Sequence, residues 1–138
     1  MRKSDILNRL RGVPLFEFCT VRDLRILERH GERLTAPAGS DLVVQDHDGS
    51  AFYLVLDGDA RVIRNNRTIA RLGSGDHFGE LALLDPSPRN ATVRAETDVT
   101  VLVISHRMFN VVMRDLPGLR RAMLRSMAQR LRTLDRSL

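Results

Sequence analysis

The sequence is poor in the residues on which several classes of protein depend. It has one cysteine, no tryptophan and only 4% aromatic residues. The lone Cys19 excludes an internal disulfide and a cysteine-based zinc cluster. We expect Cys19 to be a small core residue and the protein to occupy a reducing, cytoplasmic setting. No apolar run approaches the roughly 20 residues of a membrane helix, and no secretory signal is visible. The few aromatics disfavour a surface that stacks nucleic-acid bases.

What the sequence does contain is enough apolar material for a core. Of 138 residues, 43% are hydrophobic and 28% are charged. Disorder of the whole chain is therefore not expected, and one compact domain over residues 1–138 is the simplest organisation at this length. The residue patterns divide that domain into three zones, which are helical over 1–31, strand-rich over 32–105 and helical again over 106–135.

The positive charge is concentrated in the C-terminal zone. The chain carries a net charge of +5, and residues 106–138 hold eight arginines against only two aspartates. The preceding residues 1–105 are almost neutral. A basic segment of this kind can attract nucleic acid or an acidic partner, or it can simply be the solvated face of a helix.

The N-terminal zone predicts two helices. Ser4 is placed to cap a short first helix. Thr20 followed by Asp23 matches the pattern of a capping box for a second helix, which Gly31 would end.

The middle zone predicts many short strands. Turn signals recur along it, among them Asp48-Gly49 and Asn65-Asn66, and the second suits a tight hairpin because asparagine tolerates positive φ. The aliphatic and β-branched runs between the turns are Leu42–Gln45, Phe52–Leu56, Ala60–Arg64, Thr68–Leu72, Ala91–Ala95 and Thr100–Ile104. This spacing favours a sandwich or jelly-roll barrel over a parallel α/β sheet. Within the zone, Glu80–Leu84 favours a short helix instead.

The C-terminal zone predicts two further helices. Ser105 can cap the first, over His106–Asp115, and the second begins near Leu119 after a Pro117-Gly118 break. The apolar positions of the second helix form a single stripe: Leu119, Met123, Met127, Leu131, Leu134 and Leu138. Such a stripe either packs against its own domain or pairs with a second copy of the chain.

Residues that suggest chemistry are concentrated between positions 78 and 93. Gly79 permits a tight turn or a close ligand approach, and the helical turn starting at Glu80 directs free backbone N–H groups outward, as anion sites do. Arg89 lies in the returning loop and can hold a phosphate through two parallel hydrogen bonds. A carboxylate beside an anion site fits a ligand with hydroxyls as well as phosphate, which means a nucleotide or sugar phosphate. The alternative is an Arg89–Glu80 salt bridge beside a structural turn.

This segment resembles the phosphate-binding cassette of the cyclic nucleotide-binding domain family. The match in order and spacing covers Phe78–Leu84 and Arg89–Val93, and upstream glycines also fit. The family includes bacterial cAMP receptor proteins, regulatory subunits of cAMP-dependent kinase and cyclic nucleotide-gated channels. The resemblance spans roughly residues 15–135. It implies a mainly β fold, a β-roll with helices before it and two helices after it.

The resemblance also implies roles for individual residues. Glu80 matches the acceptor for the ribose 2′-hydroxyl, and Arg89 matches the partner of the cyclic phosphate. Backbone amides near Ala82 and Asn90 match the donors to phosphate oxygens. The other expected ligand-binding residues are Phe78 and Gly79 in the cassette, Leu81, Ala82 and Ala91 lining the pocket, Val62 and Leu72 toward the base, and Arg130 and Leu134, with Met127 and Leu131, on the last helix.

By this resemblance the chain is a sensor of a cyclic nucleotide, and its last helix closes over the base. Family members with Thr at the position of Asn90 prefer cGMP and those with Ala or Ser prefer cAMP. Asparagine is neither, so we expect cAMP and leave cGMP possible. A homodimer through the last helix is also compatible with the pattern. No helix-turn-helix follows in this chain, so we do not expect direct DNA binding.

A second hypothesis keeps the fold without the ligand. In that case the domain is a scaffold whose basic last helix contacts nucleic acid or an acidic protein. Other chemistry has weaker support. Gly73, Gly75 and Gly79 miss the spacing of a dinucleotide loop, the lone lysine Lys3 cannot supply a Walker motif, and no nucleophile elbow is present. The four histidines are scattered. We therefore expect neither an enzyme nor a metal site.

Overall fold

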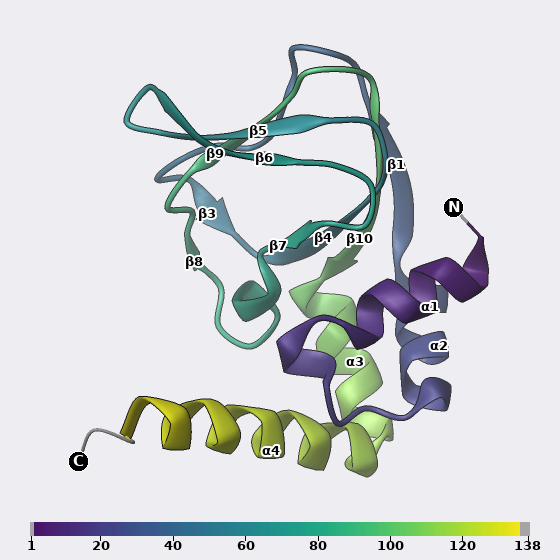
Figure 1. Cartoon of the computed structure of the whole chain (residues 1–138). Helices are drawn as coiled ribbons and strands as arrows, with labels where there is room; N and C mark the ends of the chain where they lie inside the picture. Colours follow the sequence, from purple (N-terminus) through teal and green to yellow (C-terminus); the bar gives the residue numbers. More distant parts are fainter. Residues whose placement is uncertain (1, 136–138) are drawn as a thin grey trace.

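The computed structural model describes residues 2–135 of the chain (Figure 1). The N-terminal zone forms α1 (Lys3–Arg11), a 3-10 turn η1 (Pro14–Phe16) and α2 (Val21–His30). The predicted capping box of α2 is confirmed: the Thr20 hydroxyl accepts from the Asp23 N–H, and the Asp23 carboxylate accepts from the Thr20 N–H. The predicted cap at Ser4 is wrong, because α1 begins one residue earlier and Ser4 lies inside it.

The middle zone of the described residues forms ten short strands. These are β1 (Glu32–Ala36), β2 (Asp41–Val43), β3 (Asp48–Gly49), β4 (Ala51–Asp57), β5 (Ala60–Arg64), β6 (Arg67–Leu72), β7 (His77–Phe78), β8 (Ser87–Pro88), β9 (Thr92–Ala95) and β10 (Val99–Ser105). They pair antiparallel in two four-stranded sheets, β1-β10-β4-β7 and β2-β9-β5-β6, with β3 and β8 paired beside them. Figure 1 shows the two larger sheets facing one another. The prediction of a mainly β roll with flanking helices is confirmed.

A 3-10 turn, η2 (Glu80–Leu83), interrupts the strands where the sequence favours a short helix. The predicted Asn65-Asn66 hairpin is also present, since both residues have positive φ, 50° and 66°, and join β5 to β6. The sequence patterns miss β3, β7 and β8 because strands of two residues show no periodicity. They also miss β1, whose residues are mostly exposed.

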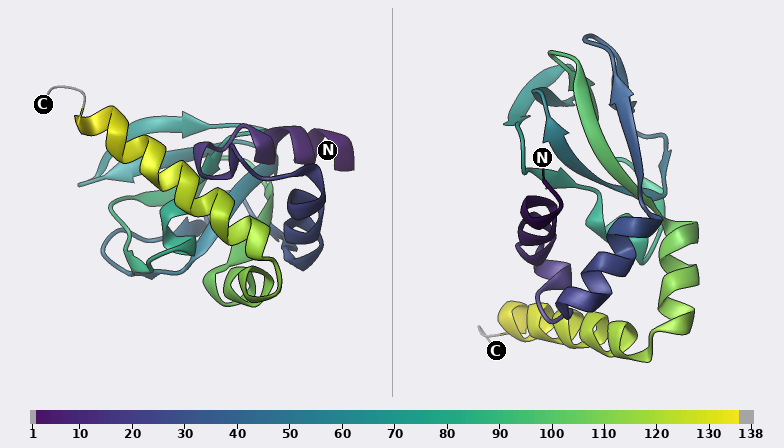
Figure 2. Two further views of the ribbon diagram at one scale, coloured as in Figure 1. Left: turned by 90° about the horizontal axis from the view of Figure 1, so that it is seen from below. Right: turned by 90° about the vertical axis from the view of Figure 1, so that its right-hand side faces the viewer.

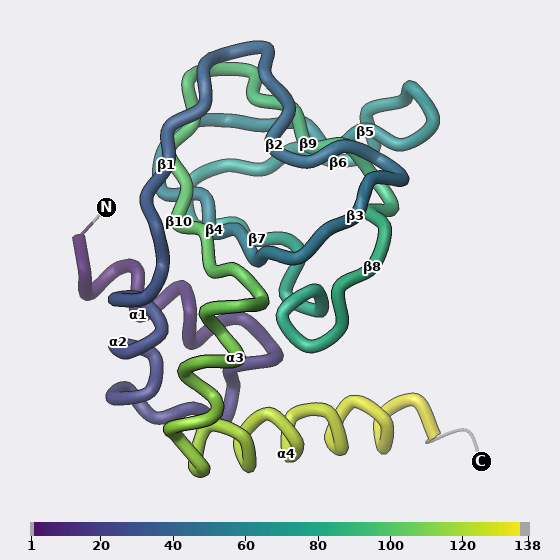
Figure 3. Tube along the Cα trace, turned by 180° about the vertical axis from the view of Figure 1, so that it is seen from behind, coloured from purple at the N-terminus to yellow at the C-terminus, as the bar shows by residue number. Residues whose placement is uncertain are grey.

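The buried side chains form two clusters. The larger one fills the space between the helices and the face of β4 and β10 that is turned toward them, where Phe16 and Phe52 meet edge to face with centroids 5.6 Å apart. The smaller one contains Val55, Ala95, Val99 and Val101 from the two sheets. Figures 2 and 3 show the result, with the roll at one end of the molecule and the helices gathered at the other.

The C-terminal zone forms α3 (His106–Asp115) and α4 (Pro117–Leu134). The Ser105 hydroxyl accepts from the Met108 N–H at 3.1 Å, so the predicted cap of α3 is confirmed. The second helix starts at Pro117 rather than Leu119, because proline fits the first turn, where its missing N–H has no partner to lose.

The apolar stripe of α4 is divided along its length. Leu119 and Met123 are buried against the helical core, whereas Leu131 and Leu134 are 59% and 75% exposed. The first half therefore packs on its own domain, helped by the Ser126 hydroxyl, which donates to the Pro14 carbonyl at 2.9 Å. Pairing of the second half with another copy stays a prediction, and Leu138 lies outside the described residues.

Candidate functional site

A cavity of about 300 Å³ opens at the side of the roll. It is lined by Phe78–Ala82 and Ser87–Ala91, which lie within the predicted cassette segment 78–93, and by Val43, Val62 and Val93 from the sheet. Its volume lies at the lower end of the range typical of small-molecule sites. The two parts of the cassette, which the sequence separates by an intervening loop, are thus brought to one hollow.

Gly79 starts the first wall of this hollow. Its φ of 81° lies in the left-handed region that favours glycine, and the η2 turn follows directly. Within η2 the Ala82 N–H donates to the Gly79 carbonyl at 3.1 Å. Because that N–H is used inside the turn, a role for the Ala82 amide as a phosphate donor stays a prediction.

Arg89 also lines this hollow, and backbone hydrogen bonds fix its position. The Arg89 N–H donates to the His47 carbonyl at 2.8 Å, and the Asp46 N–H donates to the Arg89 carbonyl at 2.7 Å. The side chain reaches inward, where Nη2 donates to the Ala51 carbonyl at 2.7 Å and the guanidinium lies 5.8 Å from the ring centroid of Tyr53.

Two glycines make room for this side chain. A Cβ on Gly79 would lie 2.5 Å from Nη1 of Arg89 and 2.7 Å from the Ala51 carbonyl oxygen, and a Cβ on Gly49 would collide with the Arg89 Nε. Gly79 is recognisable from the sequence as a turn position, whereas the role of Gly49 is not. We infer that both positions are glycine because the guanidinium passes between them.

The electrostatics of Arg89 favour an anion. Its Nε is buried and has no hydrogen-bond partner among the described residues. Burial lowers the pKa of the guanidinium from its ordinary value, and the neighbouring Tyr53 opposes that shift. Arginine nevertheless stays charged at neutral pH. A charge with an unsatisfied donor is costly to bury, so a bound phosphate would relieve a cost that the protein alone leaves uncompensated.

The salt-bridge alternative is not realised. Over the described residues, no ion pair joins Arg89 to Glu80, although Glu80 lines the same cavity and is half-buried. The carboxylate and the guanidinium therefore face one hollow without neutralising each other by contact. This is the arrangement that a ligand with both hydroxyls and a phosphate requires.

Only some of the other expected site residues line the cavity. Ala82 and Ala91 are buried in the cavity wall, while Leu81 and Asn90 are exposed at its rim. Val62 lines the cavity, but Leu72 packs beside the smaller core cluster instead. The residues expected on α4, Arg130 and Leu134, are not among the residues that line the cavity. A contact between a ligand and Leu72, Arg130 or Leu134 stays a prediction.

Two contacts that support the cassette are not predictable from the sequence. Tyr53 stacks on Phe78 with centroids 4.8 Å apart and planes 6° apart. On the helical side, Nδ1 of His106 lies 2.6 Å from the Leu83 carbonyl oxygen, which joins η2 to the first residue of α3. Both contacts connect residues more than 20 positions apart, which no local motif shows.

Other chemistry is sparse in the described part of the chain. Cys19 packs against the main core, and burial, with a smaller effect of the nearby Asp23 carboxylate, raises the pKa of its thiol to about 12. It is therefore a poor nucleophile at neutral pH. No cluster of three potential metal-ligating side chains is found in residues 2–135, and none of the helices there combines the length and apolarity needed to cross a bilayer.

Comparison with known proteins agrees with this geometry. The sequence pattern of the cyclic nucleotide-binding domain matches residues 33–115, which is more than half of the chain. The chain belongs to the cyclic nucleotide-binding domain family. The domain is 31% identical to the cyclic AMP receptor protein of Thermus thermophilus over 91% of this chain and 61% of that protein. It is 42% identical to the regulatory subunit of cAMP-dependent protein kinase of Schizosaccharomyces pombe over 53% of this chain and 18% of that protein.

Solved structures of the family are also similar. The N-terminal domain of a transcriptional regulator from Streptomyces coelicolor superimposes with a TM-score of 0.84 at 30% identity, covering 91% of this chain and 94% of that one. The regulatory domain of Toxoplasma gondii cAMP-dependent kinase, crystallised with cAMP, gives 0.70 at 28% identity, covering 80% of this chain and 44% of that one. The cyclic nucleotide-binding domain thus spans less than two thirds of the curated relatives named above. The resemblance inferred from Phe78–Val93 is confirmed as a family relationship.

Proposed function

We propose that this cyclic nucleotide-binding domain is a sensor of cAMP. The observation that carries the proposal is the half-buried Arg89 side chain, which lines the same cavity as Glu80 and whose buried Nε has no hydrogen-bond partner among the described residues. The cyclic phosphate would accept from Arg89, and Glu80 would accept from the ribose 2′-hydroxyl. The kinship with cAMP receptor and kinase regulatory proteins supports cAMP as the ligand.

The purine would lie toward Val62, which is the sheet residue of the cavity expected to face the base. No hydroxyl stands at position 90, where the exposed Asn90 lies, so we expect cAMP to bind more tightly than cGMP. Because Arg130 and Leu134 lie outside the cavity here, their predicted contact with the base requires α4 to move on binding. A ligand drives such a movement only if it binds the closed arrangement more tightly than the open one.

Calorimetry with two ligands and two proteins tests the assignment of Glu80 and the sugar. Wild-type protein and Glu80→Ala, which has no side-chain acceptor, are titrated with cAMP and with 2′-deoxy-cAMP, and cGMP serves as the purine comparison. If Glu80 accepts from the 2′-hydroxyl, removing that hydroxyl weakens binding to wild type by about tenfold and changes binding to Glu80→Ala much less.

Three results would contradict the proposal. Wild-type protein that binds no cyclic nucleotide would end it. Equal losses on removing the hydroxyl in both proteins would remove the role of Glu80. Tighter binding of cGMP than of cAMP would reverse the choice of ligand.

A further inference from the structure

Arg64 lies next to the cavity because of its place on β5: it is not itself a lining residue, but it is hydrogen-bonded to Asn90, which is. Side chains alternate along a strand, so Ala60, Val62 and Arg64 share one face. Ala60 is fully buried and Val62 lines the cavity, which identifies this face as the inner one. Arg64 is the last residue of the strand and is exposed. Figures 1 and 3 show the β5–β6 hairpin tip on the same side of the roll as β3 and β8.

A hydrogen bond holds Arg64 against the cassette. Its Nε donates to the Asn90 carbonyl at 3.0 Å, and Asn90 follows Arg89 directly. The hairpin tip itself is fixed, since the side-chain amide of Gln45 donates to Oδ1 of Asn65 and accepts from the Asn65 N–H, both at 2.9 Å. Arg64 is thus a positioned guanidinium beside the cavity, not a freely sampling surface side chain.

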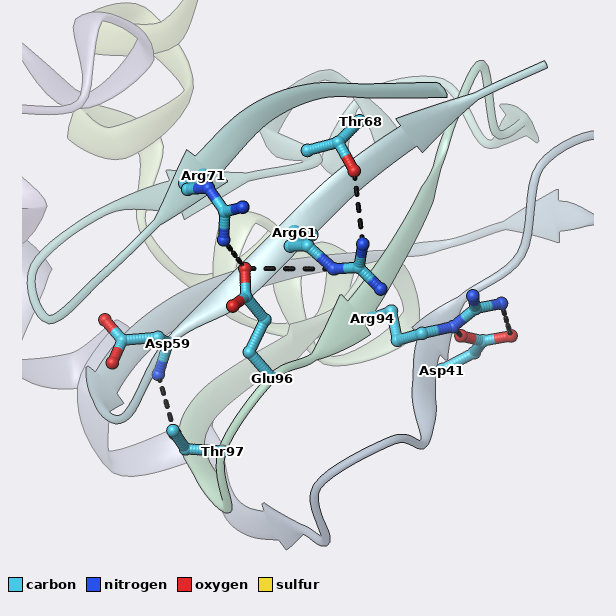
Figure 4. A network of polar contacts seen from close by, with 8 residues as sticks. All are labelled: Asp41, Asp59, Arg61, Thr68, Arg71, Arg94, Glu96 and Thr97. Carbon is cyan, nitrogen blue, oxygen red and sulfur yellow. Dashed lines mark hydrogen bonds and ion pairs between the residues drawn. The ribbon is translucent and has the colours of Figure 1, made fainter. Parts of the chain in front are cut away.

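The charge of Arg64 is not neutralised by the protein. Its partner across the hairpin is Arg67, and like charges directly opposite in a ladder are destabilising. Neither arginine forms an ion pair within the described residues. The outer face of the same sheet differs, because there Arg61 and Arg71 both contact Glu96 (Figure 4). Repulsion between paired arginines that the protein itself does not neutralise is expected at a site where a bound anion neutralises it.

The charge balance of the cavity also favours a further cationic residue beside it. Its charged lining residues are Glu80 and Arg89, whose formal charges cancel. A cyclic phosphodiester would bring one further negative charge into this hollow. We propose that Arg64 is a second cationic binding residue, whose guanidinium beside the cavity contacts the phosphate of the nucleotide held by Arg89. This inference rests on the proposed function and extends it to the hairpin tip.

The test compares arginines on the two faces of one sheet. Wild type, Arg64→Gln, Arg64→Lys and the outer-face control Arg71→Gln are titrated with cAMP at several NaCl concentrations. We expect Arg64→Gln to weaken binding about tenfold and to reduce the dependence of the dissociation constant on salt. Arg64→Lys should recover part of the loss and keep the salt dependence, and Arg71→Gln should stay within about twofold of wild type.

Each other outcome has a defined meaning. If wild type does not bind cAMP, the proposed function fails first. If wild type binds and Arg64→Gln binds equally well, only the inference about Arg64 is overturned. It is also overturned if Arg71→Gln loses as much affinity as Arg64→Gln, or if the loss in Arg64→Gln is independent of salt and is not recovered by lysine. Thermal unfolding without ligand confirms that each variant folds.

Discussion

The two faces of the β2-β9-β5-β6 sheet treat their arginines differently. On the outer face, Arg94 pairs with Asp41 at 2.8 Å, and Arg61 and Arg71 share Glu96 (Figure 4). On the cavity side, Arg64 of β5 and Arg89, which lies between β8 and β9, donate to the backbone carbonyls of Asn90 and Ala51 and form no ion pair with a carboxylate among the described residues. The outer arginines are satisfied by side chains of the protein, and the inner ones are not.

This difference distinguishes arginines that form ion pairs within the fold from arginines that are free to bind an anionic ligand. Exposed ion pairs contribute little to stability, typically about 0–1 kcal/mol, but they neutralise neighbouring arginines on adjacent strands. A half-buried guanidinium with an orphan N–H costs stability. The protein retains that cost at Arg89, which is reasonable only if a ligand offsets it. The comparison therefore predicts opposite consequences when inner and outer arginines lose their charge.

The largest expected effect comes from Arg89→Met, which keeps much of the side-chain length and removes the charge. Affinity for cAMP should fall by about 2–5 kcal/mol, because the phosphate loses a charged partner in a partly buried site. Without ligand, the free energy of unfolding should change by less than about 1 kcal/mol, because removal of the unsatisfied Nε offsets loss of the Nη2 hydrogen bond to the Ala51 carbonyl. Calorimetry and urea denaturation measure the two quantities. A ligand-free protein destabilised by more than about 1 kcal/mol would show that Arg89 supports the fold instead.

Gly49→Ala should have the next largest effect. The new Cβ would collide with Arg89 Nε, so the guanidinium must move away from its position in the cavity. We expect affinity for cAMP to fall at least about tenfold. The matched control is Gly118→Ala, because a Cβ there meets no atom within 4 Å. Unchanged affinity in Gly49→Ala would mean that the observed path of Arg89 is not needed for binding.

The position of Gly49 also shows what sequence reasoning could not reach. The caps at Thr20 and Ser105 are predictable because each joins groups three residues apart. The contact of Gly49 with Arg89 joins residues 40 apart and depends on the pairing of β3 with β8, two strands of two residues each. Such short strands have no periodicity to detect. The residues of the cassette could therefore be predicted from the sequence, but the space that Gly49 leaves for the Arg89 side chain could not.

The apolar stripe of α4 shows a second limit. The spacing of Leu119, Met123 and Leu131 predicts one apolar face, and all three do lie along α4. However, the spacing of apolar residues does not show how far along the helix the rest of the domain covers that face. Leu119 is fully buried, whereas Leu131 is 59% exposed. Whether a bound nucleotide or a second chain covers that half depends on partners that periodicity cannot identify.

The smallest expected effect comes from the outer face, through Glu96→Gln. This change removes the carboxylate that Arg61 and Arg71 share and leaves two arginines facing each other on adjacent strands. The free energy of unfolding should fall by no more than about 1 kcal/mol, and less at high salt, because these groups are substantially exposed. Affinity for cAMP should stay within about twofold of wild type. If Glu96→Gln instead weakened binding as strongly as Gly49→Ala, the two faces would be electrostatically coupled through the sheet, and the division between structural and binding arginines would not hold.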